Sequence, residues 1–350
     1  MADVPELYVT NFNKNFTGVS ATAAGVARQQ AKTYDLRLVG QPLPGLPAPI
    51  SARAATALSR TAPSGKPFAI WHVRRNTEMR AALWARDVLR RPIRIVFTSA
   101  AQRRHSAFPR WLISRMDAVV ATSDAATGFV PHVRAVVPHG VDTDLFHPAE
   151  DRAAAWAQTG FPGQRGLATV GRIRPEKGTD IFVDTMLELL PQVPDVTALV
   201  IGRAAPKHQA FLDAQKARIA EAGLTGRILF PGEVGPEEMP ALMSALSLVV
   251  NLPRYEGYGM VPLEAMASGV PFVASDTGHY RAFSAQGTTG RVVALEDSTA
   301  AAAEARTLLM NAETHAASAQ RARAVAQGEF STAREAAAIN AVYEALWAAG

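Results

Sequence analysis

The chain has 350 residues, of which 48% are hydrophobic, and a formal net charge of +5; this length exceeds a usual single domain and indicates two hydrophobic cores. Cysteine is absent, which excludes disulfides, thiolate zinc sites and cysteine nucleophiles. The first six residues lack the character of a signal peptide, and no uncharged stretch reaches the ~20 residues that span a bilayer. We therefore expect a cytoplasmic protein.

The first 149 residues alternate short apolar runs with helical patterns, which favours a parallel sheet covered by helices. The expected strands are residues 7–10, 36–39, 68–73, 93–98, 118–122 and 135–137. Residues 41–49 contain four prolines and are predicted to form a loop. Gly18 follows the first strand and precedes a helical pattern, where a turn glycine is expected.

Positive charge is concentrated in this half. Residues 1–150 hold 19 Lys and Arg against 10 Asp and Glu, and most of the excess lies in residues 66–115. Arginines suit carboxylates and phosphates, and a cationic face is attracted to anionic lipid headgroups by about 1 kcal/mol per residue. An anionic glycolipid on the inner face of the cytoplasmic membrane would fit both properties. The candidate contacts with this ligand are Arg74, Arg75, Arg103 and Arg104.

This charge has two other interpretations. Helix faces with solvated arginines give the same composition. Nucleic acid is not expected as a partner, because no interleaved aromatic pattern or binding motif accompanies the charge.

Asp142 and Asp144 have the spacing that metal-dependent enzymes use to hold a divalent ion on a diphosphate. Their neighbours, His139-Gly140 before them and Phe146-His147-Pro148 after them, instead favour aspartates that cap a turn. The eight histidines form no pair with metal-ligand spacing, so we expect no bound metal. A domain boundary is predicted after residue 149.

Residues 150–330 repeat the alternation, with expected strands at 167–170, 198–201, 228–230, 246–251, 271–274 and 291–294. The predicted fold class is therefore α/β with two doubly wound units. Residues 298–350 are alanine-rich and are predicted to be helical. In sheets of this kind, ligands bind beyond the carboxyl ends of the strands.

The segment Gly171-Arg172-Ile173-Arg174-Pro175-Glu176-Lys177-Gly178 lies between an expected strand and a helical pattern. A cationic loop that leads into a helix N-terminus gathers guanidinium, ammonium and backbone N–H groups where a diphosphate could bind. Taken alone, the segment is more typical of a basic surface turn.

Residues 254–269 set Glu256 and Glu264 eight positions apart across a glycine loop and a helix start. Gly257 and Gly259 permit backbone torsions closed to other residues. Two ionised carboxylates there can accept hydrogen bonds from vicinal hydroxyls, which indicates a polyhydroxylated ligand. A solvated loop glutamate followed by a glutamate near a helix N-terminus explains this segment equally well by itself.

The segments together resemble the family-4 glycosyltransferases, which are retaining enzymes of the GT-B fold with two Rossmann-like domains facing a central cleft. Glu256 and Glu264 match the Glu-x7-Glu segment of that family, and Arg172 and Lys177 match its Gly-Arg...Lys-Gly loop. Residues 137–148 resemble its interdomain signature, with His139 where asparagine is more usual. Residues 95–106 and 108–113 are similar to bacterial lipopolysaccharide core mannosyltransferases.

This resemblance implies transfer of a hexose without a metal or other cofactor, with GDP-mannose as the favoured donor and a Kdo-bearing lipid A precursor as the favoured acceptor. Arg172 and Lys177 would neutralise the leaving diphosphate, while Glu256 would bind the hexose and Glu264 the ribose. His105 would lie near the transferred sugar, although a satisfied structural histidine is more frequent. The other expected donor contacts are Gly18, Gly202, Arg203, Gly232, Gly257, Tyr258, Gly259, Met260 and Val261.

The resemblance also implies an acceptor-binding domain at residues 1–149 and a nucleotide-sugar-binding domain at 150–330, with a final helix at about 331–350 packed back onto the first. Two alternatives stay open: a UDP-glucose or UDP-GlcNAc transferase for another glycan, and a non-catalytic nucleotide-sugar or lipid-binding module. Donor competition would separate the first, and donor binding without transfer would favour the second.

Overall fold

The computed structural model describes residues 4–15, 17–101 and 103–350, which form two compact units. The first unit comprises the chain up to Gly140 together with Phe330–Gly350, and the second comprises Val141–Glu329. The division falls at Gly140, whereas we expected it after residue 149. The reason is Glu335, which accepts a hydrogen bond from the Gly140 N–H at 2.7 Å and lies 2.7 Å from His139 Nδ1. These contacts hold both residues in the first unit.

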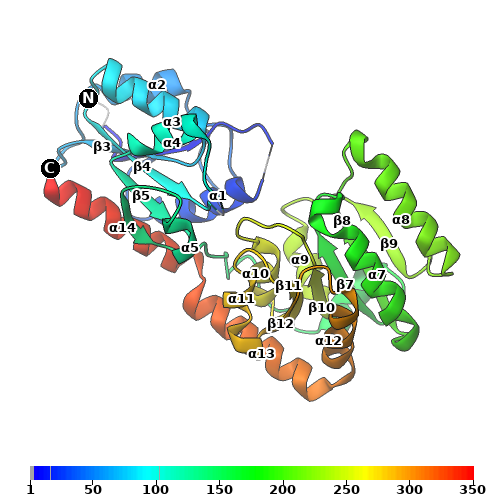
Figure 1. Cartoon of the computed structure of the whole chain (residues 1–350). Coiled ribbons are helices and arrows are strands. Elements are labelled where there is room, and N and C mark those ends of the chain that lie inside the picture. Colours follow the sequence, from blue (N-terminus) through cyan, green and yellow to red (C-terminus); the bar gives the residue numbers. More distant parts are fainter. Residues whose placement is uncertain (1–3, 16, 102) are drawn as a thin grey trace. The chain divides into compact units, whose positions relative to one another are not determined.

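The first unit is built on a six-stranded sheet with the order β2-β1-β3-β4-β5-β6 (Figure 1), and all its strand pairs are parallel. The strands are β1 (Leu7–Asn11), β2 (Leu36–Gly40), β3 (Ala69–Val73), β4 (Ile93–Ser99), β5 (Ala118–Ala121) and β6 (Val133–Val136). Every residue of β1, β3 and β5 is buried, as expected for a parallel sheet covered on both faces. The strands predicted for this half are confirmed.

The last helix of the chain completes the core of the first unit. The helices here are α1 (Gly18–Gln30), α2 (Ala52–Leu58), α3 (Asn76–Leu83) with its π-helical extension (Trp84–Val88), α4 (Ala107–Ser114), α5 (Asp124–Thr127) and α14 (Thr332–Ala349). Helix α14 lies beside α1 (Figure 1). Its Tyr343 and Trp347 are buried in a cluster with residues of β1, β3 and α1, and Trp347 Nε1–H donates to the Phe68 carbonyl oxygen at 2.9 Å.

The second unit contains a six-stranded sheet with the order β12-β11-β10-β7-β8-β9, again with parallel pairs only. The strands are β7 (Arg165–Val170), β8 (Val196–Ile201), β9 (Ile228–Gly232), β10 (Leu248–Asn251), β11 (Phe272–Ser275) and β12 (Gly290–Val293). The strands predicted for this half are also confirmed.

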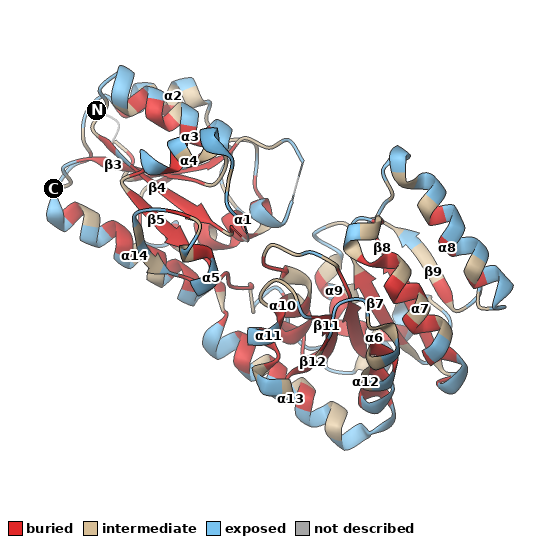
Figure 2. Ribbon diagram, in the orientation of Figure 1, coloured by how far each residue is buried: buried red, intermediate tan, exposed pale blue. Residues whose placement is uncertain are grey.

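Helices cover this second sheet, and their outer faces are exposed, while the inner strands β7, β8, β10 and β11 are mostly buried (Figure 2). They are α6 (Arg152–Gln158), α7 (Thr179–Leu189), α8 (Gln209–Glu221), α9 (Met239–Ala245), α10 (Met260–Ala267), α11 (Tyr280–Phe283), α12 (Ser298–Met310) and α13 (Ala312–Glu329). Phe182 and Met186 of α7 pack with Leu308 of α12 in the main core cluster. Among the helices described, none combines the length and apolar character that crossing a bilayer requires.

Both sheets are Rossmann-like, which confirms the predicted fold class. Counted along the chain within each unit, the strand orders are 2-1-3-4-5-6 in the first and 6-5-4-1-2-3 in the second. The direction of winding reverses between β1 and β3 in the first sheet and between β7 and β10 in the second. In such folds, the connections on either side of the reversal leave to opposite faces, and ligands bind there, beyond the carboxyl ends of the strands.

Candidate active site

The expected donor contacts of the second unit follow the carboxyl ends of four strands in its sheet. They follow β7 (Arg172 and Lys177), β8 (Gly202 and Arg203), β9 (Gly232) and β10 (the segment 256–264). Because the strands are parallel, these ends lie on one edge of the sheet. The loops after β7 and β10 flank the switch point, which is the position where this fold binds ligands.

The loop after β7 turns sharply before α7. Gly178 has a φ of 67°, and a Cβ there would overlap the carbonyl oxygen of Leu252, so both the torsion and the space require glycine. Arg172 is exposed, and among the described residues its guanidinium has no ion-pair or hydrogen-bond partner. The loop therefore presents one cation that the protein itself does not neutralise.

Arg254 joins the loop after β10 to the segment that follows β7, on the other side of the switch point. Its guanidinium forms a bidentate ion pair with Asp180, with both hydrogen bonds at 2.8 Å, and donates to the Pro175 carbonyl oxygen at 2.6 Å. The hydrogen bond to Asp180 is the main cause that raises the pKa of Arg254. Sequence reasoning assigned no role to Arg254, although its position two residues before Glu256 was a usable signal.

Glu256 and Lys177 meet at the switch point. Lys177 Nζ lies 2.5 Å from Glu256 Oε2, and the two side chains are 23% and 19% exposed. The Glu256 backbone N–H donates to Thr277 Oγ1 at 3.2 Å, and the Gly257 N–H donates to Glu256 Oε1 at 3.0 Å. The carboxylate is thus oriented by a cation and by its own loop, while part of its surface stays accessible.

The glycine loop packs against the segment after β11. Gly259 has a φ of 93°, and the Tyr280 ring fills the space that a Cβ would need. Tyr258 stacks on His279 with ring centroids 4.9 Å apart, and the His279 N–H donates to the Tyr258 carbonyl oxygen at 2.9 Å. Sequence reasoning missed Tyr280 and His279, because nothing in the local pattern of either residue shows which loop it will support.

Helix α10 begins at Met260, so Met260 and Val261 form its first turn and Glu264 lies in its second. The Glu264 side chain is half-buried, and within the described part of the chain no group donates a hydrogen bond to its carboxylate. Desolvation raises the pKa of Glu264 to about 7, because burial disfavours the charged form. This carboxylate therefore has free acceptor capacity for hydroxyl groups of a ligand.

The ends of β8 and β9 are tied together by a hydrogen bond from the Gly202 N–H to the Gly232 carbonyl oxygen at 2.8 Å. Arg203 is exposed, and its Nε lies 3.5 Å from Glu233 Oε2. Exposed ion pairs of this kind contribute little to stability, so Arg203 can turn to a ligand at small cost.

In the first unit, protein groups occupy the switch point between β1 and β3. Glu78 is fully buried and accepts five hydrogen bonds of 2.8–3.1 Å, from the backbone N–H groups of Phe12, Arg74 and Arg75, the Thr10 hydroxyl and the Arg75 guanidinium. Arg75 also donates to Asn11 Oδ1 and Ser20 Oγ at 3.0 and 3.1 Å. Arg75, which we predicted to bind the acceptor, is therefore engaged inside the unit.

The other candidates of the first unit lie in different surroundings. Gly18 opens α1, is exposed and has open space beside its Cα. Burial lowers the pKa of Arg74, and no described residue forms a hydrogen bond with its Nη1. Arg103 and Arg104 are exposed beyond the end of β4, and His105 is half-buried, with an Nε2 that finds no partner among the described residues.

Asp142 has the capping role that its context predicts. Its Oδ1 accepts hydrogen bonds from the backbone N–H groups of Asp144 and Leu145 at 3.2 and 3.1 Å. Across the residues that the structure describes, no three His, Cys, Asp or Glu side chains are grouped as metal ligands would be.

Known proteins resemble this chain along nearly its whole length. Residues 152–325 match the family described as Glycosyl transferases group 1. The chain is 40% identical over 342 residues to the lipopolysaccharide core biosynthesis mannosyltransferase LpcC of Rhizobium leguminosarum bv. viciae, covering 97% of this chain and 96% of that protein. It is also 40% identical over 345 residues to the lipopolysaccharide core biosynthesis mannosyltransferase LpsB of Rhizobium meliloti, covering 97% of each.

The fold has solved counterparts as well. The crystal structure of Anabaena Alr3699/HepE in complex with UDP and glucose matches with a TM-score of 0.81 and 18% identity, covering 97% of this chain and 99% of that one. Together with the two full-length relatives, this likeness identifies the chain as a member of the group 1 glycosyl transferases and an enzyme of the GT-B fold.

Proposed function

We propose that the protein is a retaining, family-4 mannosyltransferase that moves mannose from GDP-mannose to an anionic glycolipid, a Kdo-bearing lipid A precursor, in lipopolysaccharide core biosynthesis. The names of the two relatives that are 40% identical support the sugar and the pathway. Both relatives are covered almost completely, so the comparison extends to the acceptor-binding half as well as the donor-binding half.

The observation that carries the proposal is the pairing of Lys177 with Glu256 at the switch point of the second sheet. The two segments that carry this pair also carry Arg172 and Glu264, whose guanidinium and carboxylate have no partner among the described residues. One free cation and one free acceptor on the segments that form an oriented ion pair match a ligand with a diphosphate between two polyhydroxylated rings.

In the proposed reaction, Arg172 and Lys177 carry the negative charge that develops on the departing nucleoside diphosphate. An ammonium group has three N–H donors, so Lys177 can donate one hydrogen bond to Glu256 and the other two to phosphate oxygens. Glu256 binds hydroxyls of the mannose and stabilises its oxocarbenium-like transition state, while Glu264 binds the ribose hydroxyls.

The acceptor hydroxyl attacks the anomeric carbon on the face that the diphosphate leaves, so the configuration at that carbon is retained. The bond from the anomeric carbon to the diphosphate oxygen breaks, a new carbon–oxygen bond forms, and a diphosphate oxygen takes the acceptor proton. We assign the charge neutralisation to the two cations and not to a divalent ion.

The basic first unit is proposed to face the acceptor and the inner surface of the cytoplasmic membrane. Several of its arginines are exposed, including Arg80, Arg103 and Arg104. Cations near an anionic membrane surface are each stabilised by about 1 kcal/mol, which would favour peripheral attachment of the protein.

The first test is a donor screen followed by mass spectrometry, with GDP-mannose, UDP-glucose and UDP-GlcNAc offered in competition and EDTA present. We expect a hexose to be transferred from GDP-mannose only. The one-bond coupling between C1 and H1 in the NMR spectrum of the product should show the same anomeric configuration as in the donor. Preference for UDP-glucose or UDP-GlcNAc would contradict GDP-mannose as the donor. Loss of transfer when EDTA is present would contradict the metal-free mechanism. Donor binding without transfer would favour a non-catalytic binding module.

A further inference from the structure

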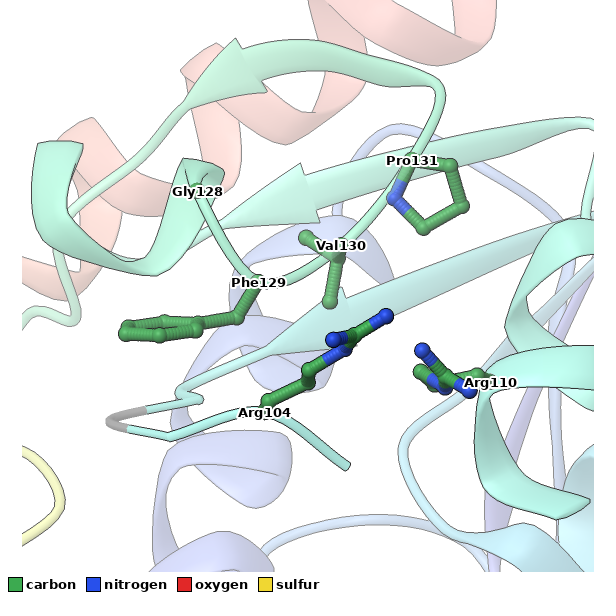
Figure 3. Close-up of a pocket in the computed structure, with 6 residues that line it drawn as sticks. All are labelled: Arg104, Arg110, Gly128, Phe129, Val130 and Pro131. Carbon is green, nitrogen blue, oxygen red and sulfur yellow. The ribbon is translucent and has the colours of Figure 1, made fainter. Parts of the chain in front are cut away.

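An open pocket of about 470 Å³ lies in the first unit and is lined by none of the residues that contact Glu78 (Figure 3). Its lining residues, here called the arginine pocket, are Arg104, Arg110, Gly128, Phe129, Val130 and Pro131. The loop with Arg104 follows the carboxyl end of β4, Arg110 lies in α4, and residues 128–131 connect α5 to β6. Arg104 thus places one side of the pocket at the carboxyl edge of the first sheet, where such folds bind ligands.

Two positive charges converge in this pocket, and the described residues supply no counterion for them. Figure 3 shows the guanidinium groups of Arg104 and Arg110 directed toward one another beside Val130 and Pro131. Neither guanidinium has an ion-pair partner in the described part of the chain, and the buried Arg110 Nε has no hydrogen-bond partner. No lining residue is acidic, so the mutual repulsion of the two cations is not offset locally.

Other arginines of the same basic stretch are neutralised by the protein. Arg86 and Arg94 share Asp117 at 2.6 and 3.0 Å, and Arg115 pairs with Asp87 at 3.2 Å. The arginine pocket differs from these three residues, because neither of its guanidinium groups has a carboxylate partner among the described residues.

The rest of the lining makes this charge more effective. Val130 is 8% exposed and Phe129 is half-buried, so apolar groups and Pro131 back the two guanidinium groups. Charge-assisted hydrogen bonds are stronger beside such walls than in open water, and a planar guanidinium offers two parallel N–H donors to a carboxylate or phosphate.

We propose that the arginine pocket is a subsite for an anionic group of the acceptor, either the carboxylate of an acidic sugar or a phosphate. The assignment to the acceptor rests on the proposed function, whereas anion binding rests on the pocket alone. A volume of about 470 Å³ is within the range of small-molecule sites. Of these residues, Arg104 was predicted from the sequence, and Arg110 and the apolar wall come from the structure.

The test uses the full chain without nucleotide. Binding of two probes, Kdo methyl glycoside and inorganic phosphate, is measured by calorimetry at low ionic strength for the wild type, Arg104→Gln and Arg110→Gln. Each substitution removes charged hydrogen bonds, and we expect the affinity for the bound probe to fall about 10-fold or more.

A third variant keeps both arginines and supplies an internal counterion. Gly128→Asp is sterically permitted, because Gly128 has a φ of −67° and a Cβ there meets only the Ala125 carbonyl oxygen at 3.8 Å. We expect its carboxylate to compete with the probe and weaken binding. The matched control is Arg53→Gln, which removes an exposed arginine from α2, a helix that packs on β2 at the far edge of the sheet; its affinity should be unchanged.

The outcomes separate the sources of the anion. Binding of Kdo methyl glycoside that the three variants weaken supports a carboxylate subsite, and the same pattern with phosphate supports a phosphate subsite. Absence of binding by both probes, or binding that the variants leave intact, overturns the proposal. Binding of GDP-mannose is measured on the same proteins. If the wild type does not bind GDP-mannose, the proposed donor is wrong, whereas the proposed anion subsite is not affected.

Discussion

The two switch points of this molecule share a topology and differ in what fills them. In the first unit, five protein donors saturate the Glu78 carboxylate, which leaves that carboxylate little capacity for a ligand. In the second, Lys177 and Glu256 form a partly exposed pair, and Arg172 and Glu264 on the same two segments have no partner among the described residues. The switch point thus holds a structural hydrogen-bond network in the first unit, and we propose that it binds the donor in the second unit.

The largest expected effect tests the structural role of Glu78 in the first unit. Glu78→Ala leaves the Arg75 guanidinium and several backbone N–H groups without their acceptor, and breaking a buried ion pair in this way costs about 3–5 kcal/mol. Urea unfolding should show the loss in the first unit. Thr77→Ala, an exposed neighbour, is the control, and equal stability of the two variants would refute the assignment.

The next effect tests the catalytic pair. Glu256→Ala should lower kcat by ~10²-fold or more while GDP affinity changes little, as for a group that acts mainly in the transition state. The measurement is steady-state transfer beside calorimetric GDP binding. A parallel loss of GDP affinity would reassign Glu256 to nucleotide binding.

A smaller effect concerns stability and pH at Glu264. Its pKa is raised from 4.5 to about 7 in the folded chain, so between these pH values the unfolded carboxyl is ionised while the folded one keeps its proton. Glu264 therefore destabilises the fold progressively as pH rises through this window. Glu264→Gln should be more stable than the wild type by about 3 kcal/mol above pH 7 and equal to it below pH 4.5. Thermal unfolding at several pH values checks this, and a constant difference would contradict it.

The smallest effect concerns the free cation. Arg172→Gln should weaken GDP binding by about 10-fold, the contribution of one charged hydrogen bond, without changing stability, because Arg172 has no partner in the described chain. Arg203→Gln is a useful comparison, since Arg203 already has a distant ion-pair partner in Glu233. Unchanged GDP affinity in Arg172→Gln would remove Arg172 from the site.

The sequence was sufficient for the strands, because buried parallel strands are continuous apolar runs that contrast with amphipathic helices. It also placed Lys177 and Glu256 at the ends of β7 and β10, although only the fold shows that they touch across 79 positions. The contact of Arg75 with Glu78 had a readable clue that sequence reasoning did not use, since Glu78 lies three residues later, where a helix-capping carboxylate is expected. Tyr280, His279 and the Arg254–Asp180 pair depend on which loops the sheet brings together, and no local pattern contains that information.

The insertion of α14 into the first core has a consequence for synthesis. The second unit is continuous in sequence, whereas the first needs residues from both ends of the chain. During synthesis on a ribosome, the second unit can therefore fold before the first unit, because the core of the first unit stays incomplete until Tyr343 and Trp347 have emerged. A nascent polypeptide stopped after Glu329 should show a protease-resistant second half and a digestible first half, and the reverse pattern would contradict this order of assembly.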